Sequence, residues 1–262
     1  MEKIKNLDGI CYEKNFLTDV IFRIDFSPIL SLQSSLNKEF INSIEERFKR
    51  IEQQQTIEIQ ATVGTDSKLI GNEFNFFIWK VYDINSDNYV SLSHKHLSIV
   101  TNRYTNFDAF YENINFILKN FRKFYGNDLN INRIGMRYIN KILMNSDNQF
   151  GWNKYLHDSL TQFIDNFIGN KNALTRSLTQ MHYKLNDDDN MIFTYGIYNS
   201  DFPSVISKKE FILDYDCFTR FAENRDELKI IIDFHKQVQL FFEQSITEDL
   251  RLIMKEITQN ES

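Results

Sequence analysis

Residues 107–125 carry the strongest helical pattern in the chain, and this pattern limits the folds that the chain can adopt. The apolar side chains at helical spacing are Phe107, Phe110, Tyr111, Ile114, Ile117, Leu118, Phe121 and Phe124. They predict an amphipathic helix, which Gly126 would end. Because burying one Phe side chain stabilises a protein by ~1.5–3 kcal/mol, so wide a stripe must pack against another layer of structure.

Segments with alternating polar and apolar residues predict that this layer is a β-sheet. The strands expected on this basis are residues 18–26, 56–63, 74–84, 89–101, 131–143, 173–185, 191–201 and 210–221. Helical spacing recurs in residues 36–51, 152–169 and 226–257. The segment "NDDDN" at residues 186–190 is typical of a solvated turn between two strands.

The order of these elements predicts a structural duplication. Residues 1–127 and 128–262 each read as strand, helix, three strands and helix, with a break near "YGNDLNIN" at residues 125–132. We therefore expect an α+β fold of two similar β-α-β-β-β-α halves that form one compact unit. Its sheets should be dominated by antiparallel strands, with helices packed on one face.

Charge and hydropathy exclude several classes of protein. The net charge is −6, whereas a protein that binds nucleic acid over its whole surface usually has a basic excess. The sequence has no run of ~18 uncharged apolar residues and no secretory signal, so we expect a cytoplasmic protein without a membrane partner. Cys11 and Cys217 lie far apart and are expected to be free thiols.

The segment "RIGMRYIN" at residues 133–140 places polar side chains within a strand that otherwise has the pattern of a core strand. Alternation puts Tyr138 and Asn140 on one face and Arg137 on the other. Arg137 could form a buried ion pair with Asp25 or Asp214, bind an anionic ligand or a partner's carboxylate, or lie at the surface. In the first case Arg137→Met should destabilise the protein by ~3 kcal/mol or more; in the second, folding should stay nearly intact.

Two closely spaced histidines could act as metal ligands. His94 and His96 are predicted to share one face of the strand at residues 89–101, but no third residue has the spacing of a zinc ligand. We therefore expect no metal and no cofactor. The sequence has no phosphate-binding loop, dinucleotide fingerprint or nucleophile elbow, which argues against an enzyme.

Two functional classes remain. The first is a non-enzymatic module that binds a small ligand or a protein partner, with Arg137, Tyr138, Asn140, His94 and His96 as the candidate site. The alternative is an RNA-interacting or nuclease-like protein built on paired ferredoxin-like domains, with His94, His96 and Arg137 as its polar centre. For this alternative "KNFRKFY" at residues 119–125 supplies cations but few free aromatic side chains. The sequence leaves open whether the chain forms a homo-oligomer.

Four segments carry a resemblance to a known family. These are "FLTDVIFRIDFSPI", "RYTNFDAFYENI", "RIGMRYINKI" and "FHKQVQLFFEQSITEDLRLIMK". They resemble the recurrent segments of a sporadically distributed, functionally uncharacterised bacterial protein family of about this length. The resemblance spans nearly the whole chain, and it implies a role in an accessory system, including phage defence.

Overall fold

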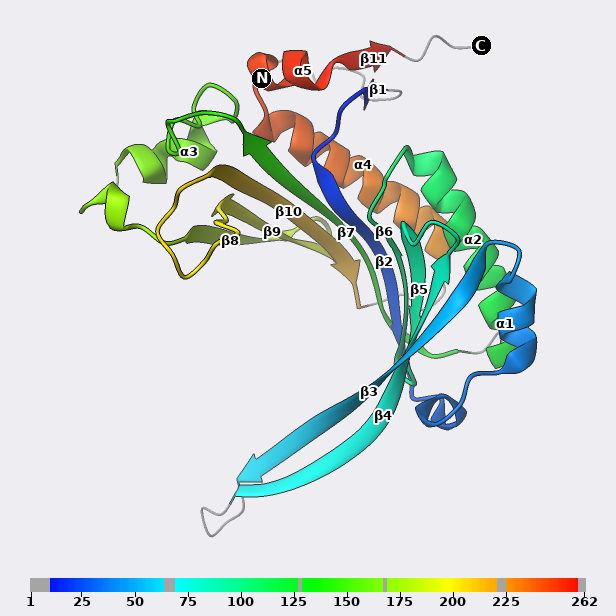
Figure 1. Cartoon of the computed structure of the whole chain (residues 1–262). Coiled ribbons are helices and arrows are strands. Elements are labelled where there is room, and N and C mark those ends of the chain that lie inside the picture. Colours follow the sequence, from blue (N-terminus) through cyan, green and yellow to red (C-terminus); the bar gives the residue numbers. More distant parts are fainter. Residues whose placement is uncertain (1–9, 64–68, 127–128, 167–168, 221–224, 259–262) are drawn as a thin grey trace. The chain divides into compact units, whose positions relative to one another are not determined.

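The computed structural model describes residues 10–63, 69–126, 129–166, 169–220 and 225–258 (Figure 1). The chain forms two compact units. Unit 1 comprises residues Met1–Val20, Gly135–Thr219 and Arg225–Ser262, and unit 2 comprises Ile21–Ile134 and Arg220–Asn224. Strands β2 (Leu17–Phe26) and β7 (Ile131–Met144) contribute residues to both units.

Unit 2 contains a sheet in the strand order β3-β4-β5-β6-β2. Strands β3 (Phe48–Val63), β4 (Leu69–Asp83), β5 (Asn88–Leu92) and β6 (His96–Thr101) form a meander of antiparallel neighbours. Strand β4 pairs with β5 only from Trp79 to Tyr82, so the outer part of the β3–β4 ribbon extends past β5.

Helices α1 (Lys38–Ile44) and α2 (Phe107–Tyr125) pack on one face of the unit 2 sheet (Figure 1). The predicted stripe of α2 is confirmed, because Phe110, Ile114 and Phe121 are fully buried. The Asn106 side chain accepts a hydrogen bond from the Ala109 N–H at the start of α2. Gly126 follows its last turn with φ +102°, a backbone conformation that glycine adopts easily.

Unit 1 contains strands in the order β2-β7-β10-β9-β8. Strands β8 (Ser177–Lys184), β9 (Asp189–Ile197) and β10 (Lys209–Thr219) are antiparallel neighbours. Helix α4 (Glu227–Ser245) packs on one face of this sheet, where the Phe241 ring meets the Tyr183 ring at 5.2 Å. Helix α3 (Asp158–Asp165) contacts the same unit through Phe163 and Tyr195.

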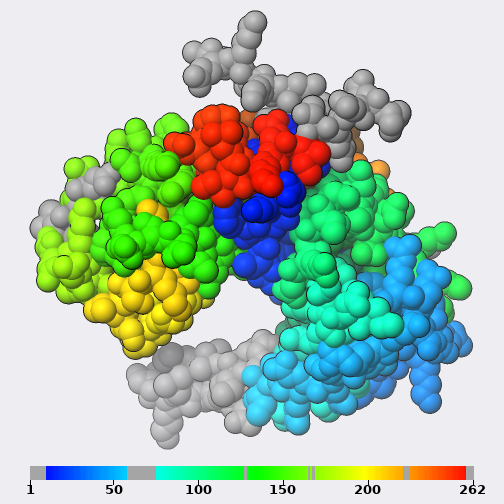
Figure 2. All heavy atoms as spheres, turned by 45° about the horizontal axis from the view of Figure 1, so that its top comes forward, coloured from blue at the N-terminus to red at the C-terminus, as the bar shows by residue number. Residues whose placement is uncertain are grey.

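The first and last strands of the described chain pair with each other. Strand β1 (Ile10–Tyr12) is antiparallel to β11 (Glu256–Thr258), with Ile10 opposite Thr258. In Figure 2 the red C-terminal segment, which includes helix α5 (Glu248–Met254), lies beside the blue N-terminal strand. Two short 3₁₀ helices, η1 (Leu30–Gln33) and η2 (Lys171–Ala173), complete the elements of the described residues.

Three predicted helices are shorter than expected. The helix expected at residues 36–51 ends at Ile44, and β3 begins at Phe48. The helix expected at residues 152–169 is helical only from Asp158 to Asp165, and Phe167 lies outside the described residues. The helix expected at residues 226–257 is divided into α4 and α5. Ile246 adopts an extended conformation between them and forms a β-bridge with Leu156.

The strand expected at residues 89–101 is also two elements. Strand β5 ends at Leu92 and β6 begins at His96, so His94 lies in the turn between two antiparallel strands. The prediction that His94 and His96 share one strand face is therefore wrong. The Ser93 N–H donates to the His96 carbonyl at 2.9 Å across this turn.

The predicted α+β class is confirmed, with antiparallel strand pairs and helices packed on one face in each unit. The duplication is not confirmed. In the described part of the chain, four strands lie between α1 and α2 and three between α3 and α4, so the two element orders differ. Within the described residues, none of the helices is both long enough and apolar enough to cross a membrane.

Candidate functional site

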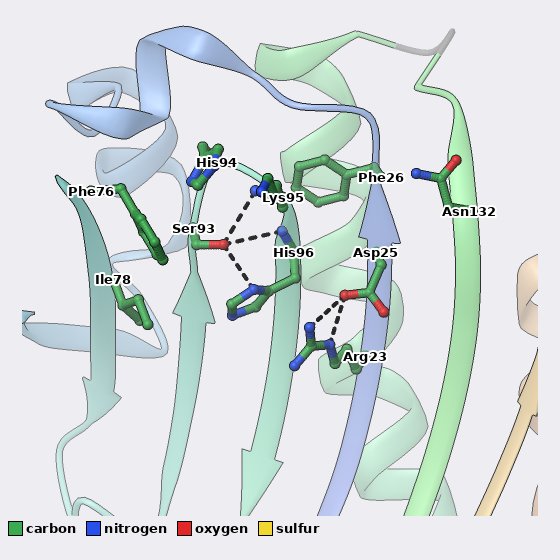
Figure 3. A pocket seen from close by; sticks show the side chains of 10 residues that line it. All are labelled: Arg23, Asp25, Phe26, Phe76, Ile78, Ser93, His94, Lys95, His96 and Asn132. Atoms are coloured by element: carbon green, nitrogen blue, oxygen red, sulfur yellow. Dashed lines mark hydrogen bonds and ion pairs between the residues drawn. The ribbon is translucent and has the colours of Figure 1, made fainter. Parts of the chain in front are cut away.

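Unit 2 contains a pocket of about 340 Å³ beside the turn between β5 and β6. Its walls come from strands β2, β4 and β6, from the turn itself and from the start of β7 (Figure 3). The lining residues are Arg23, Asp25, Phe26, Phe76, Ile78, Ser93, His94, Lys95, His96 and Asn132. The pocket thus combines cations, imidazoles and one carboxylate with an apolar side.

The Ser93 hydroxyl organises the turn. Its Oγ accepts hydrogen bonds from the backbone N–H groups of Lys95 and His96, each at 3.2 Å, and it lies 2.8 Å from Nδ1 of His96. A hydroxyl has two acceptor lone pairs and one donor hydrogen. With both lone pairs used by the backbone, the hydrogen must go to Nδ1 of His96.

This arrangement sets the tautomer of His96. Because Nδ1 accepts the Ser93 hydrogen, the imidazole is neutral and carries its own hydrogen on Nε2. Burial, together with the positive charge of Arg23, lowers the pKa of His96 to about 4. His96 therefore enters the pocket as a neutral hydrogen-bond donor at pH 7. In Figure 3 its ring lies between Ile78 and Arg23.

Two arginines share a single carboxylate at the pocket. Arg23 donates from Nε and Nη2 to the same oxygen, Oδ1 of Asp25, at 2.8 and 2.6 Å. Nη1 of Arg133 lies 4.0 Å from the other oxygen, Oδ2. The Arg23 side chain is 44% exposed, so part of its guanidinium stays accessible to a ligand.

His94 and the aromatic side chains form the apolar side of the pocket. The rings of His94 and Phe76 meet edge to face with their centroids 4.7 Å apart. The His94 carbonyl accepts a hydrogen bond from the Ile29 N–H, and the Lys95 carbonyl accepts one from Phe26. These two bonds anchor the turn to the end of β2, which fixes the position of His94.

Arg137 forms an ion pair in unit 1 with Asp214, one of the two carboxylates that were predicted as possible partners. Its Nε and Nη2 donate to Oδ1 and Oδ2 of Asp214 at 2.8 and 2.6 Å. The Arg137 side chain is 44% exposed and that of Asp214 is 10% exposed. The hydrogen bonds to Asp214 raise the pKa of Arg137 above its ordinary value. The pair is therefore half-buried, and Arg137 is not among the residues that line the unit 2 pocket.

This geometry revises the expected effect of Arg137→Met. The variant should lower the free energy of unfolding by about 1–2 kcal/mol, between the values typical of exposed and of buried pairs, because only Asp214 is left nearly buried without its partner. Urea unfolding measures this value. The matched control is Lys184→Met, which removes a pair whose side chains are 65% and 103% exposed. A loss of 3 kcal/mol or more would mean that Arg137 is buried in solution.

Tyr138 and Asn140 lie on the opposite face of β7 from Arg137, as their alternation predicted. Each is only 4% exposed, and the Tyr138 hydroxyl lies 2.8 Å from Nδ1 of His235 on α4. Both side chains therefore face the interior of unit 1. Burial lowers the pKa of His235 to about 4, so this histidine is neutral at pH 7.

Sequence reasoning missed Arg23, Asp25, Ser93, Lys95 and Asn132 as pocket residues. Ser93 carried a local signal, because serine hydroxyls often bind backbone N–H groups two and three residues later in turns. The others carried none, since only the strand order of the sheet brings β2, β6 and β7 together.

Comparisons with known proteins add no family. No family model and no curated protein matches this chain. In the part of the chain that the structure describes, no group of three or more His, Cys, Asp or Glu side chains is arranged to hold a metal ion.

Proposed function

We propose that the protein is a non-enzymatic binding protein and that its unit 2 pocket holds a small ligand. The observation that carries this proposal is the convergence of Arg23, Lys95, His96 and Asn132 on one pocket with an apolar side. Pockets of this size, with a few polar groups on an apolar wall, are typical of small-molecule sites. The setting in a bacterial accessory system, including phage defence, is proposed from the family resemblance alone.

The state of Ser93 supports binding over catalysis. A Ser–His pair at 2.8 Å resembles the pair of a hydrolase. In a hydrolase, however, the histidine takes the proton from an accessible hydroxyl. Here Ser93 is 1% exposed and its Oγ already accepts two backbone hydrogen bonds. The hydroxyl thus serves the turn rather than a substrate.

The alternative, an RNA-interacting or nuclease-like protein, was expected to place Arg137, His94 and His96 in one polar centre. Arg137 is instead paired with Asp214 in unit 1, while His94 and His96 line the unit 2 pocket. We therefore prefer binding of a small ligand, and RNA binding stays an untested alternative. A protein partner and a homo-oligomer stay untested predictions.

Native mass spectrometry of the gently purified protein tests the proposal. Asn132→Trp places an indole at the exposed rim of the pocket and should reduce the occupancy of a co-purifying small molecule at least about tenfold, an affinity loss of roughly 1.4 kcal/mol. The matched control is Asn153→Trp, at an exposed residue of unit 1 that does not line the pocket. A ligand that Asn132→Trp retains as fully as Asn153→Trp would contradict the proposed site.

A further inference from the structure

His96 brings an open hydrogen-bond donor to the unit 2 pocket. Its Nε2 carries a hydrogen, because Nδ1 accepts from the Ser93 hydroxyl. Among the described residues, none accepts a hydrogen bond from this Nε2. The atom is also not one of the buried polar atoms that solvent cannot reach. Since His96 lines the pocket, its Nε2–H is available to a ligand.

Arg23 presents a second set of open donors. A guanidinium holds five N–H groups in a planar fork, and the side of this fork formed by Nε and Nη2 donates to Oδ1 of Asp25. The end of the fork, formed by Nη1 and the second hydrogen of Nη2, has no acceptor among the described residues. Arg23 lines the pocket and its side chain is 44% exposed. Its two parallel N–H groups can therefore bind two adjacent acceptor atoms of one ligand.

The charge of Arg23 is already balanced within the pocket. Oδ1 of Asp25 lies 2.6 Å from its Nη2. A second anion at the end of the same fork would lie close to Asp25 and would be repelled by it, whereas a neutral pair of acceptors would not. Lys95 also lines the pocket, but it has an interaction of its own, so its ammonium is not counted among the open donors. These contacts favour a neutral ligand.

The opposite wall of the pocket is apolar. Figure 3 shows Phe76 and Ile78 on the β4 side and Arg23 on the β2 side, with the His96 ring between Ile78 and Arg23. The strand order β4-β5-β6-β2 produces this arrangement. A flat ring with acceptor atoms along one edge can contact both walls at once. The volume of about 340 Å³ is within the range of small-molecule pockets.

We propose that the pocket binds a 6-oxopurine base, as in guanosine, whose O6 and N7 accept hydrogen bonds from the end of the Arg23 fork. This proposal rests on the proposed function and names the class of its ligand. An arginine fork that donates to O6 and N7 of guanine is the commonest specific contact between a side chain and a base in protein–DNA complexes. Nε2 of His96 donates to the second lone pair of O6, and the flat ring packs against Phe76 and Ile78.

Isothermal titration calorimetry with guanosine, adenosine and 7-deazaguanosine tests the proposal. Adenosine carries an amino donor in place of O6, and 7-deazaguanosine carries a C–H group in place of N7. Guanosine should bind at least about tenfold more tightly than either analogue, because it alone offers both acceptors to the fork. A tenfold difference is roughly 1.4 kcal/mol, within the range for one bidentate contact to a base.

Arg23→Lys tests the fork without removing its charge. Lysine keeps a cation beside Asp25 but cannot present two parallel N–H groups, so guanosine binding should weaken at least about tenfold while adenosine binding changes little. The matched control is Arg103→Lys, which replaces an arginine of unit 2 that is 78% exposed and does not line this pocket. The affinity of this control for guanosine should equal that of the unmodified protein.

Ile78→Thr is a second variant, which tests the apolar wall. Threonine is also β-branched and suits a strand, but it removes apolar surface where the ring should pack. Guanosine binding should weaken at least about fivefold, roughly 1 kcal/mol. The matched control is Ile57→Thr on the neighbouring strand β3, where the side chain is 55% exposed and does not line the pocket. Its guanosine affinity should be unchanged.

Three results would overturn the 6-oxopurine ligand. These are equal binding of guanosine and either analogue, no effect of Arg23→Lys and Ile78→Thr on guanosine binding, and no saturable binding of guanosine. Benzoate, a flat anionic probe, would overturn this inference while supporting the proposed function if it bound more tightly than guanosine and were displaced by Asn132→Trp. A single-stranded RNA pentamer with one guanosine that binds at least about tenfold more tightly than guanosine would overturn both.

Discussion

Replacing Trp152 with alanine is expected to lower the free energy of unfolding of unit 1 by about 4 kcal/mol, within the range for truncating a buried aromatic side chain. Trp152 is 1% exposed, and its ring centroid lies 5.2 Å from that of Phe211 on β10. Its indole N–H donates to the Gln149 carbonyl at 2.9 Å, and the Lys209 ammonium lies 5.2 Å from its ring. The substitution therefore removes packing, a hydrogen bond and a cation–π contact together.

Urea unfolding followed by circular dichroism measures this effect. The matched control is Leu252→Ala in the same unit, where the side chain is 68% exposed, and its expected change is within about 0.5 kcal/mol. A loss below about 1.5 kcal/mol for Trp152→Ala would show that the segment before α3 is not packed as described.

Replacing Arg251 with methionine is expected to lower the free energy of unfolding by about 3 kcal/mol, because it leaves a buried carboxylate without its cation. Arg251 Nε donates to Glu243 Oε2 at 3.0 Å, and the two side chains are 19% and 9% exposed. The Tyr12 hydroxyl donates to the other oxygen, Oε1, at 2.7 Å. Burial and the hydrogen bond to Glu243 raise the pKa of Tyr12, so it remains a neutral donor.

A double variant separates two free energies: the stabilisation by the Arg251–Glu243 pair, and the destabilisation by a buried charge that has lost its partner. Glu243→Leu together with Arg251→Met removes both charges and should recover at least about 1 kcal/mol relative to Arg251→Met alone. Chemical denaturation of the three variants and the unmodified protein completes the cycle. If the loss of unfolding free energy in the double variant equals the sum of the losses in Glu243→Leu and Arg251→Met, the two side chains are not coupled.

Much of the fold could be predicted where local pattern and tertiary packing agree. The alternation of β7 placed Tyr138 and Asn140 on one face and Arg137 on the other. The structure confirms this division, because Tyr138 and Asn140 are each 4% exposed and the Arg137 side chain is 44% exposed. The α2 stripe is likewise confirmed. In both elements the apolar face that the sequence specifies is the face that the core covers.

The predicted bounds of the helices were wrong where tertiary contacts overrode the pattern. Ile246 continues the apolar spacing of α4, but the neighbouring carbonyl of Ser245 accepts from the His157 N–H and the Thr247 N–H donates to the Tyr155 carbonyl. These bonds divide the helix. The sequence carried a signal for this division, because Thr247 followed by Glu248 and Asp249 is typical of a helix start.

The candidate site was the part least accessible to sequence reasoning. His94 and His96 were selected as neighbours on a strand, whereas the structure brings them together through a turn held by Ser93. Arg23 joins them because β2 pairs with β6, although residues 24–95 separate Arg23 from His96 in sequence. Such long-range pairings leave no local periodicity from which they can be predicted.

The pairing of β1 with β11 affects how the protein can be made in the cell. Unit 1 takes its segments from both ends of the described chain, and Ile10 cannot meet Thr258 until translation has passed that residue. Residues 21–134 of unit 2 emerge from the ribosome as one continuous segment and can begin folding during synthesis. Vectorial synthesis therefore favours completion of the unit 2 pocket before β1 pairs with β11.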